Sequence, residues 1–549
     1  MLKLAAALLL TALPVAVHAA PRTGDRAEPS SRSDTGNRAE TANRIADAEF
    51  NHGEVVETAA YLADRIGGRL TNSPAMREAE RWTQAKFREW GLRNVHAEAF
   101  DFGRGWWIEN ASVRMVAPRP LALRAIPVAW TPGTNGAVSA PVVVAPMSDP
   151  RHFDEWRGKL RGKIVLVTLP SEPRDNAKPN FERMTDAEIG KLNEYEQPAS
   201  DPHGLERRIK RRNFPAQLDA FLKAEGAVAW ARMSYRPNGL LHGEGYLYKV
   251  GETPALPGIE IAAEDYRRLA RLAKSGPVSL EINANVHFDD SDRNAYDVFA
   301  EIPGTDPGAG YVMAGAHLDS WVAGDGAADN GAGSAVVMEA ARLLASLGVR
   351  PKRTIRFALW AGEEQGLLGS FAWIDRNLAT RPAASNPDVA AAGPYANMYS
   401  YPVTPRPGFR DLTAYFNIDN GSGKIRGIYA EGNLAAVPTL RDWLSPFQSM
   451  GAGAVVAQTT GGTDHVGMAR LGVPAFQFIQ DPLEYESIVH HSNLDTFDHL
   501  RAQDLRQASA VLASVLLSAA DTDKPLPHNV LPTRPNPTDP FKYDNPDER

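Results

Sequence analysis

Short apolar runs alternate with amphipathic segments along the second half of the chain. Residues 331–347 and 505–520 carry apolar positions at helical spacing, and Gly348 marks the end of the first predicted helix. The runs that are typical of buried strands cover residues 311–316, 354–360, 412–418 and 473–479. Strands that alternate with helices in this way predict an α/β fold.

The first half of the chain carries two different patterns. Residues 55–91 predict two helices that are interrupted at Gly67 and Gly68, and residues 94–102 predict a strand. From residue 112 to residue 286 short β-like runs are separated by Pro and Gly, with one short helix expected at 217–226 and no cluster of ligand-type residues. We therefore expect an inserted β-rich domain without chemistry of its own. The α/β pattern returns with a strand at 297–302.

The two ends of the chain differ from the rest. Residues 1–19 contain Lys3, an apolar run and a Val-x-Ala ending, which is typical of a secretory signal peptide cleaved after Ala19. A buried N-terminal helix is the alternative, and the apolar run is short for a membrane span. Residues 20–44 are polar and predict a disordered leader. Residues 522–549 are rich in Pro, Asp and Asn and predict an extended tail.

Composition narrows the class of protein. The 549 residues favour two or three domains, and 59 basic against 66 acidic residues give a net charge of −7, which argues against a nucleic-acid partner. The basic run at 206–213 is interpreted as a solvated helix face. There is no Cys, which excludes a disulfide framework and a lipid anchor on Cys.

Polar residues stand at the ends of the predicted strands. His317 follows the strand at 311–316, and Asp319 comes two residues later. Asp329 lies in a Gly-rich turn before the helix at 331–347, and Glu363 and Glu364 follow the strand at 354–360. Open α/β sheets bind ligands at the carboxyl ends of their strands, so this placement predicts a metal site.

Each residue also has a simpler interpretation. Asp329 could cap the following helix, and the two Glu residues could form a solvated first helical turn. The pair His490 and His491 could be hydrogen-bonded surface residues. The order His, Asp, Glu-Glu, Asp, His favours a metal site, because Asp419 directly follows the strand at 412–418.

Six short motifs occur in one order. They are AHLDS from Ala316, ADNGAGS from Ala328, WAGEEQGLLGS from Trp360, NIDN from Asn417, GTDH from Gly462 and HHSNLDT from His490. In these motifs the chain resembles the M28 family of zinc peptidases, and the segment ending in HHSNLDT is similar to the plasma glutamate carboxypeptidase-like branch. The resemblance implies a three-layer α/β/α, phosphorylase/hydrolase-like domain with a mixed sheet, formed by residues 45–111 and 293–521. Residues 112–292 would be an inserted protease-associated (PA) domain.

The resemblance also implies two zinc sites. One Zn²⁺ would be held by His317 and Asp419, the other by Glu364 and His491, with Asp329 between them. Two zinc ions about 3.5–4 Å apart can share and activate a water molecule. Such nitrogen and oxygen ligands suit Zn²⁺, and Co²⁺ or Mn²⁺ could also bind.

The remaining roles follow from the same resemblance. Asp319 would orient His317 by accepting its second imidazole N–H, and Glu363 would be the general base. Several aminopeptidases of the family have a Tyr before the last His ligand, where this chain has His490. His490 or Tyr485 could be the donor to the oxyanion, and the sequence leaves both open.

These implications predict an exported metallo-exopeptidase, secreted or periplasmic, that acts on peptides and has no membrane span after signal removal. An aminopeptidase is favoured. The alternatives are a dipeptidase or carboxypeptidase, a one-metal acyl-transfer relative and a non-catalytic, receptor-like member. The long segment at 380–410, with Tyr395, Tyr399 and Tyr401, is expected to line the substrate cleft.

Overall fold

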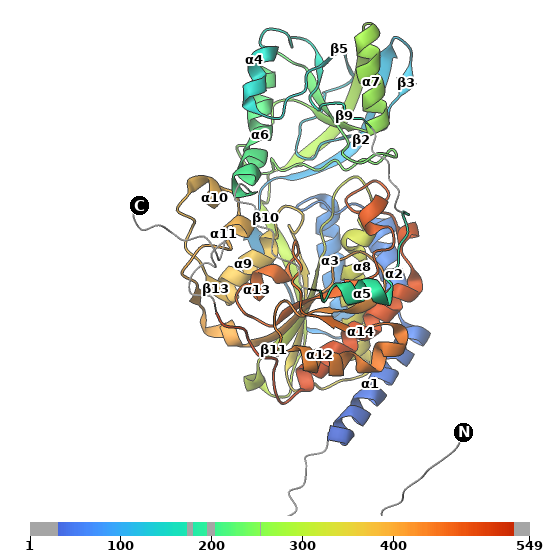
Figure 1. Cartoon of the computed structure of the whole chain (residues 1–549), viewed down its shortest axis with the longest axis vertical. Helices are drawn as coiled ribbons and strands as arrows, with labels where there is room; N and C mark the ends of the chain where they lie inside the picture. Colours follow the sequence, from blue (N-terminus) through green and yellow to red (C-terminus); the bar gives the residue numbers. More distant parts are fainter. Residues whose placement is uncertain (1–30, 173–178, 195–203, 253, 532–549) are drawn as a thin grey trace, which may run out of the picture.

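The computed structural model describes residues 31–172, 179–194, 204–252 and 254–531, so the predicted signal peptide at 1–19 lies outside the described residues. The chain is built on two eight-stranded sheets. In Figure 1 the unit built on the sheet that contains β2 (Gly105–Ala117) lies above a larger unit. The larger unit is formed by residues that precede and follow the upper unit in the sequence.

The sheet of the larger unit is mixed. Its strands β12, β11, β15 and β18 are parallel, whereas β10 and β16 run antiparallel to their neighbours β12 and β18. The order across the sheet is β1 (Arg93–Asp101), β10 (Asn294–Ile302), β12 (Thr354–Trp360), β11 (Tyr311–His317), β15 (Leu412–Asn417), β18 (Ala475–Gln480), β16 (Ile425–Tyr429) and β17 (Ala454–Val456). His317 pairs with Trp360 in register, so the polar segments that follow β11 and β12 leave the sheet at the same edge.

Alternating strand residues face two helical layers. Val312 and Ala314 belong to the core under α8 (Ala332–Ser346) and α14 (Ala502–Asp521), while Met313 and Trp360 belong to the core on the side of α9 (Leu368–Asn377) and α13 (His465–Ala469). This period of two is what a sheet covered on both faces requires. The predicted three-layer α/β/α fold with a mixed sheet is therefore confirmed. The other helices of this unit are α2 (Val55–Ala60), α3 (Pro74–Glu89), α10 (Pro387–Ala391), α11 (Pro394–Asn397) and α12 (Val437–Leu444).

The N-terminal segment differs from the prediction of a disordered leader at 20–44. Helix α1 spans Ser31–His52, and Ala42 and Ile45 are buried in the core beside α14. These two apolar positions at helical spacing dock the helix, while its other faces are polar and gave the segment its disorder-like composition. In the part of the chain that the structure describes, no helix combines the length and apolar character needed to cross a membrane.

The upper unit begins earlier than predicted, because β2 starts at Gly105 rather than at residue 112. Its strand order is β3 (Leu121–Ala122), β2 (Gly105–Ala117), β9 (Ser279–Asp289), β5 (Val138–Val144), β6 (Ile164–Leu166), β7 (Ala229–Met233), β8 (Gly258–Ile261) and β4 (Ala125–Pro127). Its helices are α4 (Phe153–Trp156), α6 (Gly204–Ala224) and α7 (Ala263–Ser275). Helix α6 is much longer than the predicted 217–226 and contains Pro215, a residue that disfavours a helix interior.

Three further segments lie outside the two eight-stranded sheets. Helix α5 (Asp186–Lys191) belongs to the insert in sequence but lies on the larger unit in Figure 1, where Arg426 contacts Asp186 at 3.2 Å. The segment at 380–410 contains α10, α11 and the short strands β13 (Ala379–Thr380) and β14 (Thr404–Pro405). The described part of the predicted tail is irregular, and the side chain of Leu526 is buried against the core.

Candidate metal centre

His317 is held at the carboxyl end of β11, where it is almost fully buried. Its Nε2 lies 3.2 Å from Oδ1 of Asp419, which follows the neighbouring parallel strand β15. The same Nε2 lies 3.3 Å from Oδ1 of Asp329 in the turn that precedes α8. Three separated segments thus bring a ring nitrogen and two carboxylates together.

His491 forms a second cluster of the same kind. Its Nε2 lies 3.0 Å from Oε2 of Glu364 and 3.3 Å from Oδ2 of Asp329. Asp329 therefore directs one carboxylate oxygen to each His, an arrangement that suits a ligand shared by two cations. The five residues His317, Asp329, Glu364, Asp419 and His491, which are separated by up to 174 positions in the sequence, gather at one edge of the sheet.

The donor atoms fit metal ions. Oδ2 of Asp329 and Oε1 of Glu364 are buried and have no hydrogen-bond partner among the residues that the structure describes. Ligand atoms of His317, Asp329 and Glu364 lie within 4.8 Å of one another, as do those of Asp329, His490 and His491. Buried carboxylate oxygens without partners are costly, and a bound cation would satisfy them.

Burial and neighbouring charges shift the pKa values of the side chains in this cluster. Burial, together with the nearby Asp329 carboxylate, raises the pKa of Glu364 to about 7. Burial opposes protonation of His317, but Asp419 and Glu363 together raise the pKa of its imidazole well above its usual value. The carboxylates around these groups disfavour a further negative charge on Glu364 and stabilise the positive charge of a protonated His317.

Asp319 lies in the site but makes a different contact from the predicted one. Nδ1 of His317 is 2.9 Å from the backbone carbonyl oxygen of Asp319, while the Asp319 carboxylate is 3.7 Å away. That carboxylate instead accepts hydrogen bonds from Thr71 Oγ1 at 2.8 Å and from the backbone N–H groups of Glu363 and Glu364, each at 3.3 Å. It therefore fixes the Glu pair, and the main chain orients the His.

Glu363 stands next to this network. Its side chain is buried, and its backbone N–H donates to Oδ1 of Asp319 at 3.3 Å. Burial raises the pKa of Glu363 well above its usual value. A carboxyl group with a raised pKa beside metal ligands is suited to take up a proton.

Both candidate donors lie beside Asp329. The His490 ring is 3.9 Å from that of His491, and its Nε2 is 3.7 Å from Oδ2 of Asp329. The Tyr485 ring lies 4.7 Å from that of His490. Burial and the Asp329 charge raise the pKa of Tyr485 well above its usual value, which keeps its phenol as a donor.

Two positioning residues hold the Asp329 turn. The Asp495 carboxylate accepts hydrogen bonds from the backbone N–H groups of Ala328 at 2.6 Å and Asp329 at 3.1 Å. The buried Arg69 donates to the backbone carbonyl oxygens of Leu62, Gly67, Leu318, Asp325 and Gly326. Asp495 stands in a motif visible in the sequence, but Arg69 follows two Gly residues in a segment with no ligand-like pattern.

The inserted unit also reaches the site, against the expectation that it has no chemistry of its own. Oε1 of Glu244 lies 2.9 Å from Nδ1 of His491 and accepts a hydrogen bond from Tyr235 at 3.2 Å. Arg236 donates to the backbone oxygen of His490 at 3.0 Å. Glu244 stands alone between two Gly residues, so no pattern marked it in the sequence.

The sequence also singled out the GTDH motif, which contains Asp464 and His465, and three Tyr residues of the segment 380–410. His465 is buried and its Nε2 is 3.2 Å from Oε1 of Glu431, and burial raises the pKa of the neighbouring Asp464 to about 7. Tyr395 and Tyr401 pack against the core on the side of α9, whereas Tyr399 is exposed. None of these contacts joins them to the His317 and His491 clusters.

Comparison with known proteins agrees with this geometry. Residues 297–516 match the model of Peptidase family M28. Carboxypeptidase Q from Mus musculus is 26% identical over 481 residues, which cover 86% of this chain and 87% of that protein. A peptidase M28 precursor from Shewanella amazonensis has a TM-score of 0.63 at 23% identity, covering 91% of this chain and 99% of that chain. A zinc aminopeptidase from Bacillus subtilis has a TM-score of 0.54 at 18% identity, covering 86% and 95%.

Proposed function

We propose that the chain, whose residues 297–516 match the model of Peptidase family M28, is a two-zinc exopeptidase that releases N-terminal residues from peptides. The observation that carries the proposal is the placement of Asp329, whose two carboxylate oxygens lie 3.3 Å from His317 and 3.3 Å from His491. A single cation needs no such shared carboxylate, so this arrangement favours two ions over the one-metal alternative.

The proposed ligands divide into two sets. His317 and Asp419 would hold one Zn²⁺, Glu364 and His491 would hold the other, and Asp329 would be shared. Zinc bound there would act as a Lewis acid on the peptide carbonyl and lower the pKa of water. All five residues are present, which argues against a non-catalytic, receptor-like member.

The chain's own groups would perform the proton transfers. Glu363, buried and held by its backbone N–H on Asp319, would take the proton from the attacking water and pass it to the leaving amine. Tyr485 or His490 would donate a hydrogen bond to the carbonyl oxygen as it becomes negative. In this division of roles the Glu363 carboxylate would act on the proton while its neighbour Glu364 would bind metal.

The type of exopeptidase has two candidates. The Bacillus subtilis structure is described as a zinc aminopeptidase, which supports the release of N-terminal residues. The similarity to a carboxypeptidase Q over most of both chains supports a dipeptidase or carboxypeptidase. We also propose that the enzyme is exported, from the signal-like pattern at 1–19, and that its upper unit is a PA domain.

A peptide panel tests the proposal. The zinc-loaded protein is incubated with one tripeptide in three forms: free, N-acetylated and C-amidated. An aminopeptidase cleaves the free and amidated forms and releases the first residue, whereas a carboxypeptidase cleaves the free and acetylated forms. Metal analysis of the same sample should give two Zn²⁺ per chain. A sample that holds two Zn²⁺ and cleaves none of the peptides would contradict the proposed function.

A further inference from the structure

A cavity of about 820 Å³ lies in the upper unit, beside α6. This volume is within the range of small-ligand sites. Its wall is largely apolar, and the side chains that provide this surface include Val128, Met147, Val167, Leu169, Leu218 and Trp230. Leu169 is 68% exposed. A large exposed apolar side chain in a concave wall is more typical of a binding site than of a folding core.

One side of the cavity borders the metal centre. Glu244 and Tyr246 belong to its wall, and Glu244 is the residue that contacts Nδ1 of His491 at 2.9 Å. The Tyr246 ring packs edge-on against Trp321, with ring centres 5.5 Å apart, and the Trp321 ring lies 6.1 Å from that of His491. A peptide whose scissile bond lies at the metal ligands could therefore continue past Tyr246 into the cavity.

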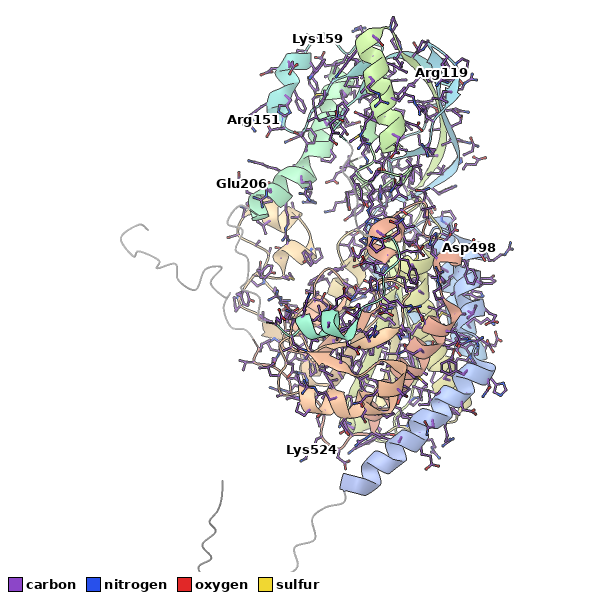
Figure 2. All side chains as sticks on the ribbon, turned by 45° about the vertical axis from the view of Figure 1, so that its right-hand side comes forward. Arg119, Arg151, Lys159, Glu206, Asp498 and Lys524 are labelled. Atoms are coloured by element: carbon purple, nitrogen blue, oxygen red, sulfur yellow. The ribbon has the colours of Figure 1, made fainter. Side chains whose placement is uncertain are left out.

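The wall carries the cations Arg207, Lys210, Arg211 and Arg232 and the carboxylates Asp149, Asp219 and Glu244, of which Asp149 pairs with Arg151 at 2.8 Å and Glu244 contacts His491. Arg232 is paired with Glu260 at 2.6 Å, and the Asp219 carboxylate accepts two backbone hydrogen bonds. Lys210 pairs with the exposed Glu206 at 2.7 Å. Arg211 has no ion-pair partner among the residues that the structure describes. Figure 2 places Glu206 at the end of α6 nearest the larger unit, and Lys210 lines a cavity together with Asn386 and Asp388 of the larger unit.

We propose that this cavity binds the part of the substrate on the carboxyl side of the scissile bond, with its apolar side chains on the wall and its terminal carboxylate at Arg211 and Lys210. The inference rests on the proposed function and gives it a substrate class. The preferred substrates are short peptides with apolar residues after the cleaved bond and a free C-terminal carboxylate. Longer or C-amidated peptides lose the interaction with α6.

The charge contribution is tested with Ala-Ala-Phe and its C-terminal amide. Arg211→Glu should raise KM for the free acid about three- to tenfold, the range of a partly exposed charge pair, with kcat and the KM of the amide nearly unchanged. Arg208→Glu is the matched control, because Arg208 is an exposed cation on the same helix but outside the cavity wall. Equal effects of the two variants, or an equal loss for acid and amide, would overturn the proposal.

The apolar wall is tested independently. Leu169→Gln should raise KM for Ala-Ala-Phe more than for Ala-Ala-Gly, while Leu434→Gln, at an exposed position outside the cavity, should leave both unchanged. Both changes are at exposed side chains, so folding is preserved. The proposed wall would be contradicted if Leu169→Gln changed KM by the same factor for both peptides, or left both KM values as they are in the unmodified protein. Failure of the unmodified protein to cleave any peptide would reject the proposed function itself, and this inference with it.

Discussion

Replacing Glu244 by Ala should weaken one metal site and leave the other intact. The change removes the acceptor for Nδ1 of His491 at 2.9 Å and for the Tyr235 hydroxyl at 3.2 Å. Loss of such a partner of a metal-bound His lowers metal affinity about 10- to 100-fold, which corresponds to about 1.4–2.7 kcal/mol. A hydrogen bond to a charged acceptor is worth about 1.5–3 kcal/mol, so two independent estimates agree.

The expected effect is asymmetric. Glu244 touches the cluster of Glu364 and His491, whereas the nearest contacts of His317 are Asp319, Asp329 and Asp419. Zinc titration of the metal-free protein in the presence of a competing chelator should resolve two binding steps. In Glu244→Ala one step should shift by one to two decades, and kcat at saturating zinc should fall less than kcat at limiting zinc.

Two controls separate this role from a general effect on the insert. Glu155→Gln alters an exposed carboxylate on α4 and should leave both binding steps unchanged. Glu244→Gln keeps an oxygen acceptor and should restore much of the affinity. The reasoning is wrong if both zinc steps shift equally in Glu244→Ala, or if neither moves.

Three other outcomes follow from the site and the core. Glu363→Gln should retain both zinc ions and lower kcat by about 10²–10⁴-fold; activity close to that of the unmodified protein would show that another group is the base. Asp329→Ala should lose metal and activity together because both clusters share it, and a retained stoichiometry of two would count against sharing. Burial and the nearby Glu339 raise the pKa of Glu49 to about 9, so Glu49 is protonated in the folded protein at neutral pH. The free energy of unfolding should therefore fall as pH rises from about 5 to about 9, because the unfolded state ionises first, and Glu49→Gln should flatten that fall in denaturant titrations.

The fold of the larger unit could be predicted from the sequence because its strands are buried on both faces. Such strands appear as continuous apolar runs, and the predicted run at 354–360 coincides with β12. The helix predicted at 331–347 is found at Ala332–Ser346. Helix α1 escaped prediction because only a few apolar positions, among them Ala42 and Ile45, dock it on a mostly polar segment.

The candidate site also contains residues that could be predicted from the sequence and residues that could not. The five proposed metal ligands could be found because they stand at strand ends and Gly-rich turns in a recognisable order. Arg69 and Glu244 could not, because each acts through contacts with segments more than 240 positions away, which leave no local pattern. A sequence also does not show which oxygen of Asp319 lies nearest to His317, and in the structure the backbone oxygen at 2.9 Å is nearer than the carboxylate at 3.7 Å.

The hydrogen bonds of Asp495 to the turn of Asp329 have a consequence for biosynthesis. A nascent chain that has emerged only as far as β15 already carries His317, Asp329, Glu364 and soon Asp419, yet lacks the group that fixes the shared carboxylate and the second imidazole. If the proposed zinc sites are correct, tight zinc uptake would wait until the segment with His491 and Asp495 has been synthesised. The order of synthesis would then delay completion of the proposed site.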